Sequence, residues 1–293
     1  MYNNILDIIG NTPLVRLNTY LTDSNVELYA KLEGGNPGGS VKDRTAKFMI
    51  EDAESRGILS QDRVLLEATS GNTGIALAMI ATMKGYRFTA VMPDNVSVER
   101  RKLLAAFGSE IILTPGHLGT NGAIEVAGDM AARDDRYLML DQFSNPANVS
   151  AHYETTGAEI VRELPQITAF VAGMGTGGTL MGVARRLKEH NPSITVVGLE
   201  PSPDSGIQGL RNMEAYNPPI FDAGKLDLCL RLPDEPSFRL ARELYVREGV
   251  SVGISSGAAL WGALEYARNI DAGVIVMIFP DRGDKYLSTD LFP

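Results

Sequence analysis

The chain has 293 residues, of which 44% are hydrophobic and 22% are charged, and its formal net charge is -9. This composition is typical of globular proteins, and the length suffices for one large α/β domain or two ordinary domains. The acidic balance makes nucleic acid and anionic membrane surfaces unfavourable partners.

The sequence does not indicate a targeting signal, a disulfide or a metal site. The first ten residues carry Asp7 and no basic cluster, which argues against a signal peptide. The apolar run 273–280 is far too short to cross a bilayer. Cys229 is the single cysteine and the three histidines show no paired spacing, so neither an internal disulfide nor a zinc site is expected. We therefore expect a cytoplasmic protein.

The segment Ser40-Val41-Lys42-Asp43-Arg44 places a lysine in the first turn of an expected helix. Ser40 and Asp43 have the spacing of a capping box, and apolar residues follow at helical intervals. The helix macrodipole opposes an ammonium at this end, so the pKa of Lys42 should be lowered, more so if burial desolvates it. Neutral lysine is the form that makes a Schiff base, although an isolated lysine is more often a solvated surface residue.

From residue 64 onward, short apolar runs alternate with helical patterns. The expected strands are 64–68, 88–92, 111–113, 169–172, 195–199, 250–252 and 274–279, and the expected helices are 74–83, 98–107, 121–132, 179–190 and 257–268. This alternation predicts βαβ units and mostly parallel sheets. Residues 141–146 are rich in turn formers and suggest a domain boundary, and the irregular stretch 201–219 is long enough for a functional loop.

Two glycine-rich turns between a strand and a helix can bind anions. The first is Thr69-Ser70-Gly71-Asn72-Thr73-Gly74, where free N–H groups and hydroxyls suit a carboxylate or phosphate; the alternative is an ordinary capped turn. The second is Gly173-Met174-Gly175-Thr176-Gly177-Gly178-Thr179, which satisfies G-x-G-x-x-G, with Glu200 suitably placed for a ribose. Its two threonine hydroxyls suit a single phosphate monoester at least as well, so both interpretations stay open.

A further turn, Gly253-Ile254-Ser255-Ser256-Gly257, matches the G-x-S-x-G nucleophile elbow. No histidine follows His190, whereas that family of hydrolases needs one after the serine, so the hydrolase interpretation fails. The segment that leads to Lys42 is also rich in glycine, at Gly34, Gly35, Gly38 and Gly39. A cofactor that needs an activated lysine, a phosphate cradle and a partner for a ring nitrogen accounts for this segment and for the turns at 173–179 and 253–257. The turn at 69–74 is then left to bind a substrate carboxylate. That cofactor is pyridoxal 5′-phosphate (PLP).

These segments together resemble the cysteine synthases (O-acetylserine sulfhydrylases), PLP enzymes of the tryptophan-synthase-β fold type. The similarity runs from Ile9-Gly10-Asn11-Thr12-Pro13-Leu14 to the tail 281–289. That tail, together with Met92-Pro93-Asp94-Asn95 and Glu99-Arg100-Arg101, is most similar to the B-type isozyme. The resemblance implies two α/β domains (PLP fold type II), each a mostly parallel twisted sheet covered by helices, with the cofactor in the cleft between them. Residues 36–145 would form a smaller, mobile domain, and residues 1–35 and 146–293 a larger domain that holds the cofactor phosphate.

The resemblance also implies roles for individual residues. Lys42 binds the cofactor as a Schiff base and acts as general base, Asn72 hydrogen-bonds the phenolic oxygen, and Ser255, with Ser256 ranked second, faces the pyridine nitrogen. The phosphate would be bound by Gly175, Thr176, Gly177, Gly178 and Thr179. The substrate carboxylate would be surrounded by Thr69, Ser70, Gly71, Asn72, Thr73 and Gln142. Arg211, in the irregular loop, resembles a position that meets an anionic sulfur donor, a solvated loop arginine being the alternative.

The implied reaction is β-replacement of O-acetyl-L-serine by sulfide or thiosulfate, which gives L-cysteine or S-sulfocysteine plus acetate. Asn212 and Met213 depart from the B-type pattern, and Pro280 replaces a frequent cysteine, which leaves the sulfur donor open. A cystathionine β-synthase-like β-replacement is the alternative, and a NAD-binding Rossmann oxidoreductase is a remote one. By analogy with relatives we expect a homodimer that acts on small molecules and forms no complex with serine acetyltransferase.

Overall fold

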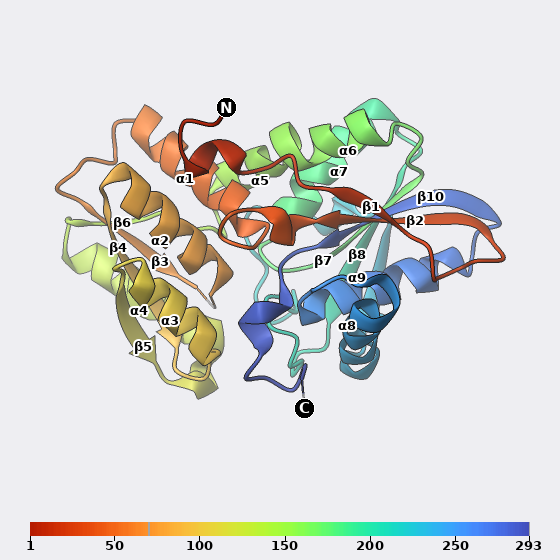
Figure 1. The fold of residues 1–293 in the computed structure, drawn as a ribbon. Helices are drawn as coiled ribbons and strands as arrows, with labels where there is room; N and C mark the ends of the chain where they lie inside the picture. Colours follow the sequence, from red (N-terminus) through yellow and green to blue (C-terminus); the bar gives the residue numbers. More distant parts are fainter. Residues whose placement is uncertain (70, 293) are drawn as a thin grey trace.

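The computed structural model describes residues 1–69 and 71–292, which form two open sheets lying side by side, each with helices packed on it (Figure 1). The larger sheet has six strands, which are in spatial order β1 (Leu14–Leu17), β2 (Asn25–Leu32), β10 (Ala272–Phe279), β7 (Ala169–Gly173), β8 (Thr195–Pro201) and β9 (Leu228–Leu232). Only the β1–β2 pair in it is antiparallel among the pairs described. The smaller sheet has four parallel strands in the order β5 (Glu110–Thr114), β4 (Arg87–Pro93), β3 (Val64–Ala68) and β6 (Tyr137–Met139).

Helices cover both faces of each sheet. Around the smaller sheet these are α1 (Lys42–Ser55), α2 (Asn72–Lys84), α3 (Val98–Ala106) and α4 (Gly119–Arg133). Around the larger sheet they are α6 (Ala158–Glu163) and α7 (Gly178–His190) on one face and α8 (Asp234–Glu248) and α9 (Ile254–Ala267) on the other (Figure 1). The short helix α5 (Pro146–Ala151) runs into a π-helical turn at His152–Gly157.

Strand β3 shows why the apolar runs predict a parallel sheet. Leu65 packs into the core formed with α1 and α2, whereas the next residue, Leu66, packs into the core formed with α4. Both faces of such a strand are buried, so its sequence is mostly apolar on both faces rather than alternating, with the buried Glu67 as the exception. The predicted βαβ architecture is therefore confirmed, and the expected strands and helices match the observed ones to within a few residues, with one exception.

The exception is the expected strand at Val250–Val252, which is wrong. Gly249 adopts a left-handed conformation that ends α8, and α9 already begins at Ile254, so the chain between them is a short extended connection. The edge of the sheet is instead formed by β9, whose residues are mostly exposed or half-buried. Val252 is nevertheless buried, which explains why the segment is apolar.

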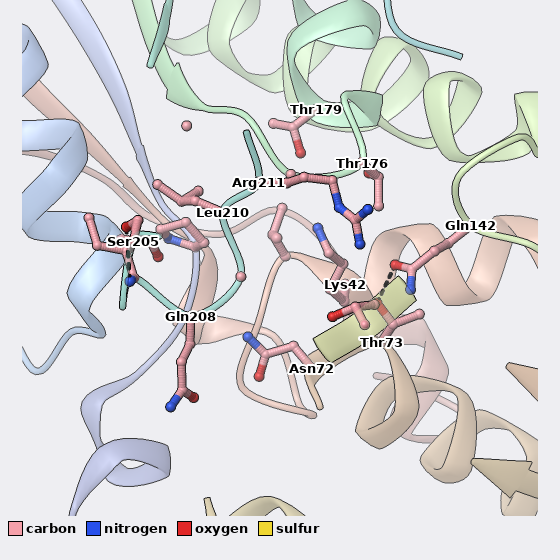
Figure 2. Close-up of a pocket in the computed structure, with 18 of the residues that line it drawn as sticks. Lys42, Asn72, Thr73, Gln142, Thr176, Thr179, Ser205, Gln208, Leu210 and Arg211 are labelled. Atoms are coloured by element: carbon pink, nitrogen blue, oxygen red, sulfur yellow. Dashed lines mark hydrogen bonds between the residues drawn. The ribbon is translucent and has the colours of Figure 1, made fainter. Parts of the chain in front are cut away.

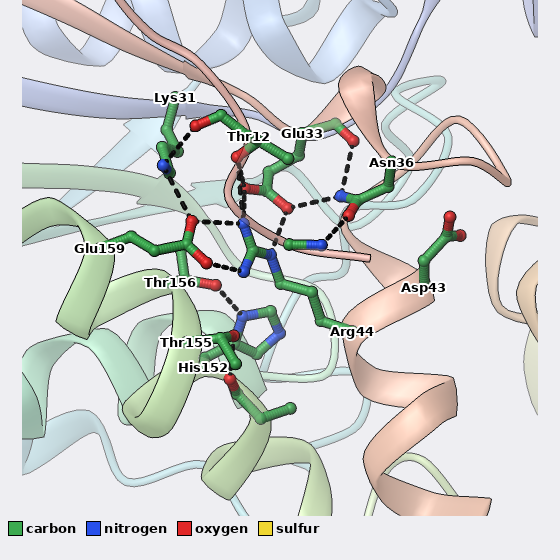
Figure 3. Close-up of polar contacts among 12 residues, drawn as sticks. Thr12, Lys31, Glu33, Asn36, Asp43, Arg44, His152, Thr155, Thr156 and Glu159 are labelled. Carbon is green, nitrogen blue, oxygen red and sulfur yellow. Dashed lines mark hydrogen bonds and ion pairs between the residues drawn. The ribbon is translucent and has the colours of Figure 1, made fainter. Parts of the chain in front are cut away.

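A buried cluster of charges joins α1 to the larger sheet (Figure 3). The guanidinium of Arg44 lies between the carboxylates of Glu33 and Glu159, with nitrogen–oxygen distances of 2.8 and 2.6 Å. Glu159 also pairs with Lys31 of β2 at 2.9 Å. Because Arg44 is two residues after Lys42, this cluster fixes the start of α1 against β2 and α6.

No helix in the described part of the chain is long and apolar enough to cross a membrane.

Candidate active site

A cavity of about 470 Å³ lies where the carboxyl ends of strands from both sheets meet. Its walls come from the turn after β3, the segment after β4, the turn between β7 and α7, and the end of β10 (Figure 2). Open α/β sheets bind ligands at this edge, because the turns between strand and helix converge there. Residues 205–211, from the irregular stretch after β8, also line the cavity.

Lys42 is the first residue of α1 and its side chain lines this cavity. Burial lowers its pKa to about 8, although the negative charges of Asp281 and Glu33 act in the opposite direction. The predicted direction of the shift is thus confirmed, and desolvation is its main cause. The predicted capping box is wrong: Val41 is the N-cap residue, and the Asp43 carboxylate instead accepts a hydrogen bond from the backbone of Gly38 at 2.5 Å.

Asn72 begins α2 and lies beside Lys42 at the cavity (Figure 2). Its amide is hydrogen-bonded on both sides by residues of the C-terminal tail. The amide Nδ2 donates to Asp281 Oδ2 at 2.7 Å, and Oδ1 accepts from Lys285 Nζ at 3.0 Å. Neither tail residue was predicted as part of the site. Their contacts join segments more than 200 residues apart in the sequence, which no local pattern indicates.

The remaining residues of the turn at 69–74 differ in their placement. Thr73 lines the cavity and donates a hydrogen bond at 2.6 Å to Gln142, which also lines it. The Thr69 hydroxyl instead accepts hydrogen bonds from the backbone of Gly71 and Gly74, so it braces the turn from within. Gly71 has φ of +141°, and a Cβ there would overlap the side chain of Arg100, so only glycine fits. Ser70 lies outside the described residues.

The turn between β7 and α7 forms a cradle at another part of the cavity. Gly175, Thr176, Gly177 and Thr179 line it, and α7 begins at Gly178. The N-cap residue, Gly177, has no side chain to cap the helix, although the Gly178 N–H donates to Thr176 Oγ1 at 3.3 Å. A Cβ at Gly175 would lie 2.8 Å from the carbonyl oxygen of Gly209, so only glycine lets the two backbone segments approach this closely. Free N–H groups at a helix start, flanked by hydroxyls, are an anion site.

Buried polar residues support the cradle from behind. The Thr176 hydroxyl accepts a hydrogen bond from Asn148 at 3.0 Å, and Thr179 lies 3.2 Å from Nε2 of His152. Burial, together with the positive charges of Lys42 and Arg44, lowers the pKa of His152 well below its usual value. His152 is therefore neutral at physiological pH and positions hydroxyls without adding charge.

Ser255 and Ser256 occupy different environments at the start of α9. Ser255 lines the cavity, whereas Ser256 is fully buried and is not among the lining residues. Of the two candidates for a contact to a ligand in the cavity, the geometry favours Ser255.

Two arginines approach the cavity from opposite sides of the cleft between the sheets. Arg211 lines it (Figure 2). Its guanidinium donates to Asn121 of α4 at 2.9 Å and stacks on Phe143 and Tyr216. Burial lowers the pKa of Arg211, so it is not the freely solvated loop residue of the alternative interpretation. Arg100 of α3 is buried, stacks over the Tyr286 ring and donates to Gln208. The sequence singled out Arg100 only as part of a B-type segment.

Glu200 does not lie where a ribose contact would require. It is absent from the residues that line the cavity, and it accepts a hydrogen bond from the backbone of Met213 at 2.8 Å. The dinucleotide interpretation of the turn at 173–179 therefore lacks its acidic partner. Among the described residues, no group of three histidine, cysteine or acidic side chains forms a candidate metal site.

The cavity fits PLP by the chemistry of its walls. A lysine of lowered pKa suits the aldehyde, the start of α7 with its glycine cradle suits the phosphate, and Asn72 and Ser255 supply neutral polar contacts between them. The fold and the site therefore define a two-sheet α/β enzyme built around a phosphate-bearing aldehyde cofactor.

Comparisons with known proteins identify the family. The model of the family described as "Pyridoxal-phosphate dependent enzyme" matches residues 5–281, so the chain belongs to this family of PLP enzymes. It is 50% identical over 292 residues to cysteine synthase B of Salmonella typhimurium, covering 99% of this chain and 96% of the relative. The crystal structure of O-ureido-L-serine synthase superposes with a TM-score of 0.95 at 42% identity, covering 100% of this chain and 95% of that one. An O-acetylserine-dependent cystathionine β-synthase from Helicobacter pylori has a TM-score of 0.95 at 37% identity, covering 100% and 99%.

Proposed function

We propose that the protein is a cysteine synthase that replaces the acetoxy group of O-acetyl-L-serine with sulfur. The observation that carries this proposal is Lys42, whose pKa is lowered to about 8 in a cavity with an anion cradle and a Thr73–Gln142 pair. Its relatives of known name include a cysteine synthase B at 50% identity over nearly the full length. We assign the B-type on the same basis and on the segments that resemble it.

In this proposal Lys42 Nζ binds the cofactor and moves the α-proton of the substrate. When bound, PLP withdraws electrons from the substrate α-carbon and so weakens the bonds around it. Lys42 can act as a base only after the amine of the substrate has displaced it from the cofactor. Released in its neutral form, Lys42 accepts the α-proton, acetate departs from the β-carbon, and Lys42 returns the proton after sulfur has added and then binds the cofactor again. A pKa of about 8 serves both directions at neutral pH, because both protonation states are then accessible.

The cofactor's polar groups are assigned to three sets of residues. Gly175, Thr176, Gly177, Gly178 and Thr179 bind the phosphate at the start of α7. Asn72 donates a hydrogen bond to the phenolic oxygen, and Ser255 meets the pyridine nitrogen. A neutral hydroxyl at Ser255 does not favour protonation of the ring nitrogen as a carboxylate would, which favours loss of the β-substituent over side reactions.

The substrate carboxylate is assigned to the turn at 69–74 and to Gln142. The start of α2 presents backbone N–H groups, and Thr73 and Gln142 add polar contacts at the wall of the cavity. Thr69 contributes by bracing the turn, since its hydroxyl accepts two backbone hydrogen bonds there. Ser70 is assigned to the substrate carboxylate from the resemblance alone.

Arg211 is assigned to the sulfur donor. Its guanidinium lines the cavity and has no carboxylate among its described hydrogen-bond partners, only the side-chain oxygen of Asn121. A partly desolvated guanidinium attracts a dianion such as thiosulfate more than the smaller sulfide. We therefore propose that the enzyme accepts thiosulfate as well as sulfide.

The larger organisation is proposed as follows. Residues 36–145 form the smaller, mobile domain, and residues 1–35 with 146–293 form the larger one. The Arg211–Asn121 and Arg100–Gln208 hydrogen bonds join these two parts beside the cavity and would change if the domains moved. We also propose a cytoplasmic homodimer that does not associate with serine acetyltransferase.

The function is tested by supplying the purified, PLP-loaded protein with O-acetylserine and sulfide and measuring cysteine by mass spectrometry. We expect cysteine formation that is lost in Lys42→Ala, along with covalent cofactor attachment. Replacing sulfide with homocysteine tests the cystathionine β-synthase alternative. The similar H. pylori protein is described as a cystathionine β-synthase that depends on O-acetylserine, so the same first substrate serves for both assays. Cystathionine formed faster than cysteine would contradict the proposal.

A further inference from the structure

The C-terminal tail places two buried charged residues against Asn72, and neither of them lines the cavity. Asp281 follows β10, and Lys285 lies in the short helical turn Gly283–Tyr286. Both are almost inaccessible to solvent, at 2% and 1% exposure. Buried charges are costly unless they are paired and hydrogen-bonded, so their presence here calls for a reason.

The hydrogen bonds of Lys285 are complete. Its ammonium donates to the carbonyl oxygens of Gly38 and Gly39, at 3.0 and 3.2 Å, and to Asn72 Oδ1 at 3.0 Å. An ammonium has three protons and no acceptor, so every one of its donors is used. Gly38 and Gly39 precede Lys42, and Lys285 therefore ties the loop that leads to Lys42 to the amide of Asn72.

Asp281 provides the opposite polarity on the other side of the same amide. Its Oδ2 accepts hydrogen bonds from Asn72 Nδ2 and from the hydroxyl of Tyr286, both at 2.7 Å. Turning the Asn72 amide over would face its NH₂ group toward the Lys285 ammonium and its oxygen toward the Asp281 carboxylate. That turn would lose two charge-assisted hydrogen bonds and create two repulsive contacts.

This arrangement decides what Asn72 can offer to a ligand. Its oxygen is engaged by Lys285, whereas its nitrogen has two protons and gives only one to Asp281. The remaining proton has no acceptor among the described hydrogen bonds of this amide, and Asn72 lines the cavity beside Lys42, so a ligand there can take it. An amide in the opposite orientation would present its oxygen, which is an acceptor, there instead.

We propose that Asp281 and Lys285 are positioning residues that lock the Asn72 amide with its N–H toward the cavity, so that it can bind an anionic oxygen of the cofactor. The inference rests on the proposed function, in which that oxygen is the phenolic oxygen of PLP. The proposal explains why the charged side chains of Asp281 and Lys285 are buried here, although they contact neither substrate nor cofactor.

The test is the absorption spectrum of the PLP-loaded protein at fixed pH. A hydrogen bond to the phenolic oxygen stabilises its ionised form, which absorbs in the visible, over the protonated form, which absorbs in the near ultraviolet. Lys285→Met removes the ammonium and keeps the size of the side chain. We expect it to lower the ratio of visible to near-ultraviolet absorbance about fivefold, the factor that corresponds to one lost hydrogen bond.

Two comparisons separate positioning from a merely structural role. Ser288→Ala removes another hydrogen bond of the tail, the one at 2.7 Å to Glu99 of α3, and should leave the ratio unchanged. In an Asn72→Ala background, Lys285→Met should have no further effect on the ratio, because the group it orients is gone. An equal effect in both backgrounds, or no effect in the wild-type background, would overturn the proposal.

A second variant keeps the test decisive if Lys285→Met does not fold, as judged by thermal unfolding. Asp281→Asn keeps the size but removes the charge that the amide nitrogen faces, and the same direction of change is expected. A wild-type protein that acquires no visible band with PLP would refute the proposed function itself. A coloured wild type whose ratio survives both substitutions would refute only the role of the tail.

Discussion

The lowered pKa of Lys42 predicts how fast the protein captures its cofactor at each pH. Only neutral amine attacks an aldehyde, and the pKa of Lys42 falls from 10.5 to about 8 through burial. At pH 7 this raises the neutral fraction about 300-fold over an ordinary lysine, from roughly 0.03% to about 9%. The rate of capture should rise about tenfold per pH unit up to pH 8 and then level off.

The assay mixes cofactor-free protein with PLP in a stopped-flow instrument and follows the change in absorbance between pH 6 and 10. N-α-acetyl-lysine, treated identically, corrects for the ionisation of PLP itself and should not level off until above pH 10. Lys42→Ala serves as the blank. Because the charge of Asp281 raises the pKa of Lys42, Asp281→Asn should move the bend to lower pH. A rate that follows acetyl-lysine up to pH 10 would refute our account of Lys42.

Three further predictions concern the charged groups around the site. Arg44→Met should lower the free energy of unfolding by about 3–5 kcal/mol in urea titrations, because it leaves Glu33 and Glu159 buried without their partner. Burial alone would raise the pKa of Glu159, but Arg44 and Lys31 lower it from 4.5 to about 2. The contribution of ionised Glu159 to the free energy of unfolding is therefore present above pH 4.5 and is lost as the pH falls toward 2. That contribution is about 3 kcal/mol, and urea titrations across this range should show it in the wild type and much less of it in Arg44→Met. Arg211→Ala should reduce kcat/KM for thiosulfate about tenfold more than for sulfide, and equal losses for both donors in steady-state assays would contradict its assignment.

The parts of the fold that could be predicted are those in which local pattern and burial agree. Strands β3 and β4 are covered on both faces, so most of their residues are apolar, with Glu67 and Thr89 as buried exceptions, and they stand out from the helical segments beside them. The turns that follow parallel strands meet at one edge of a sheet, which is why residues read as separate motifs line a single cavity.

Prediction failed where long-range contacts override local pattern. Ser40 and Asp43 have capping-box spacing, yet Asp43 is buried and bonds Gly38, so the spacing alone did not decide its partner. Strand β2 was missed because charged residues interrupt its apolar pattern. One of them, Lys31, is fully buried, since Glu159 pairs with it from a helix more than 100 residues away.

The same reasoning explains which functional residues the sequence concealed. Lys285, Asp281 and Arg100 read as surface charges, because charged side chains are almost never fully buried unless they are paired. Each is buried here by a partner from a distant segment: Lys285 and Asp281 by Asn72, and Arg100 by Tyr286 and Gln208. A motif can name the side chain that touches the cofactor, since its turn is local. The charged groups that orient that side chain come from segments distant in the sequence, and they meet it only where the two sheets pack together. They can therefore be identified from the folded structure but not from a local motif.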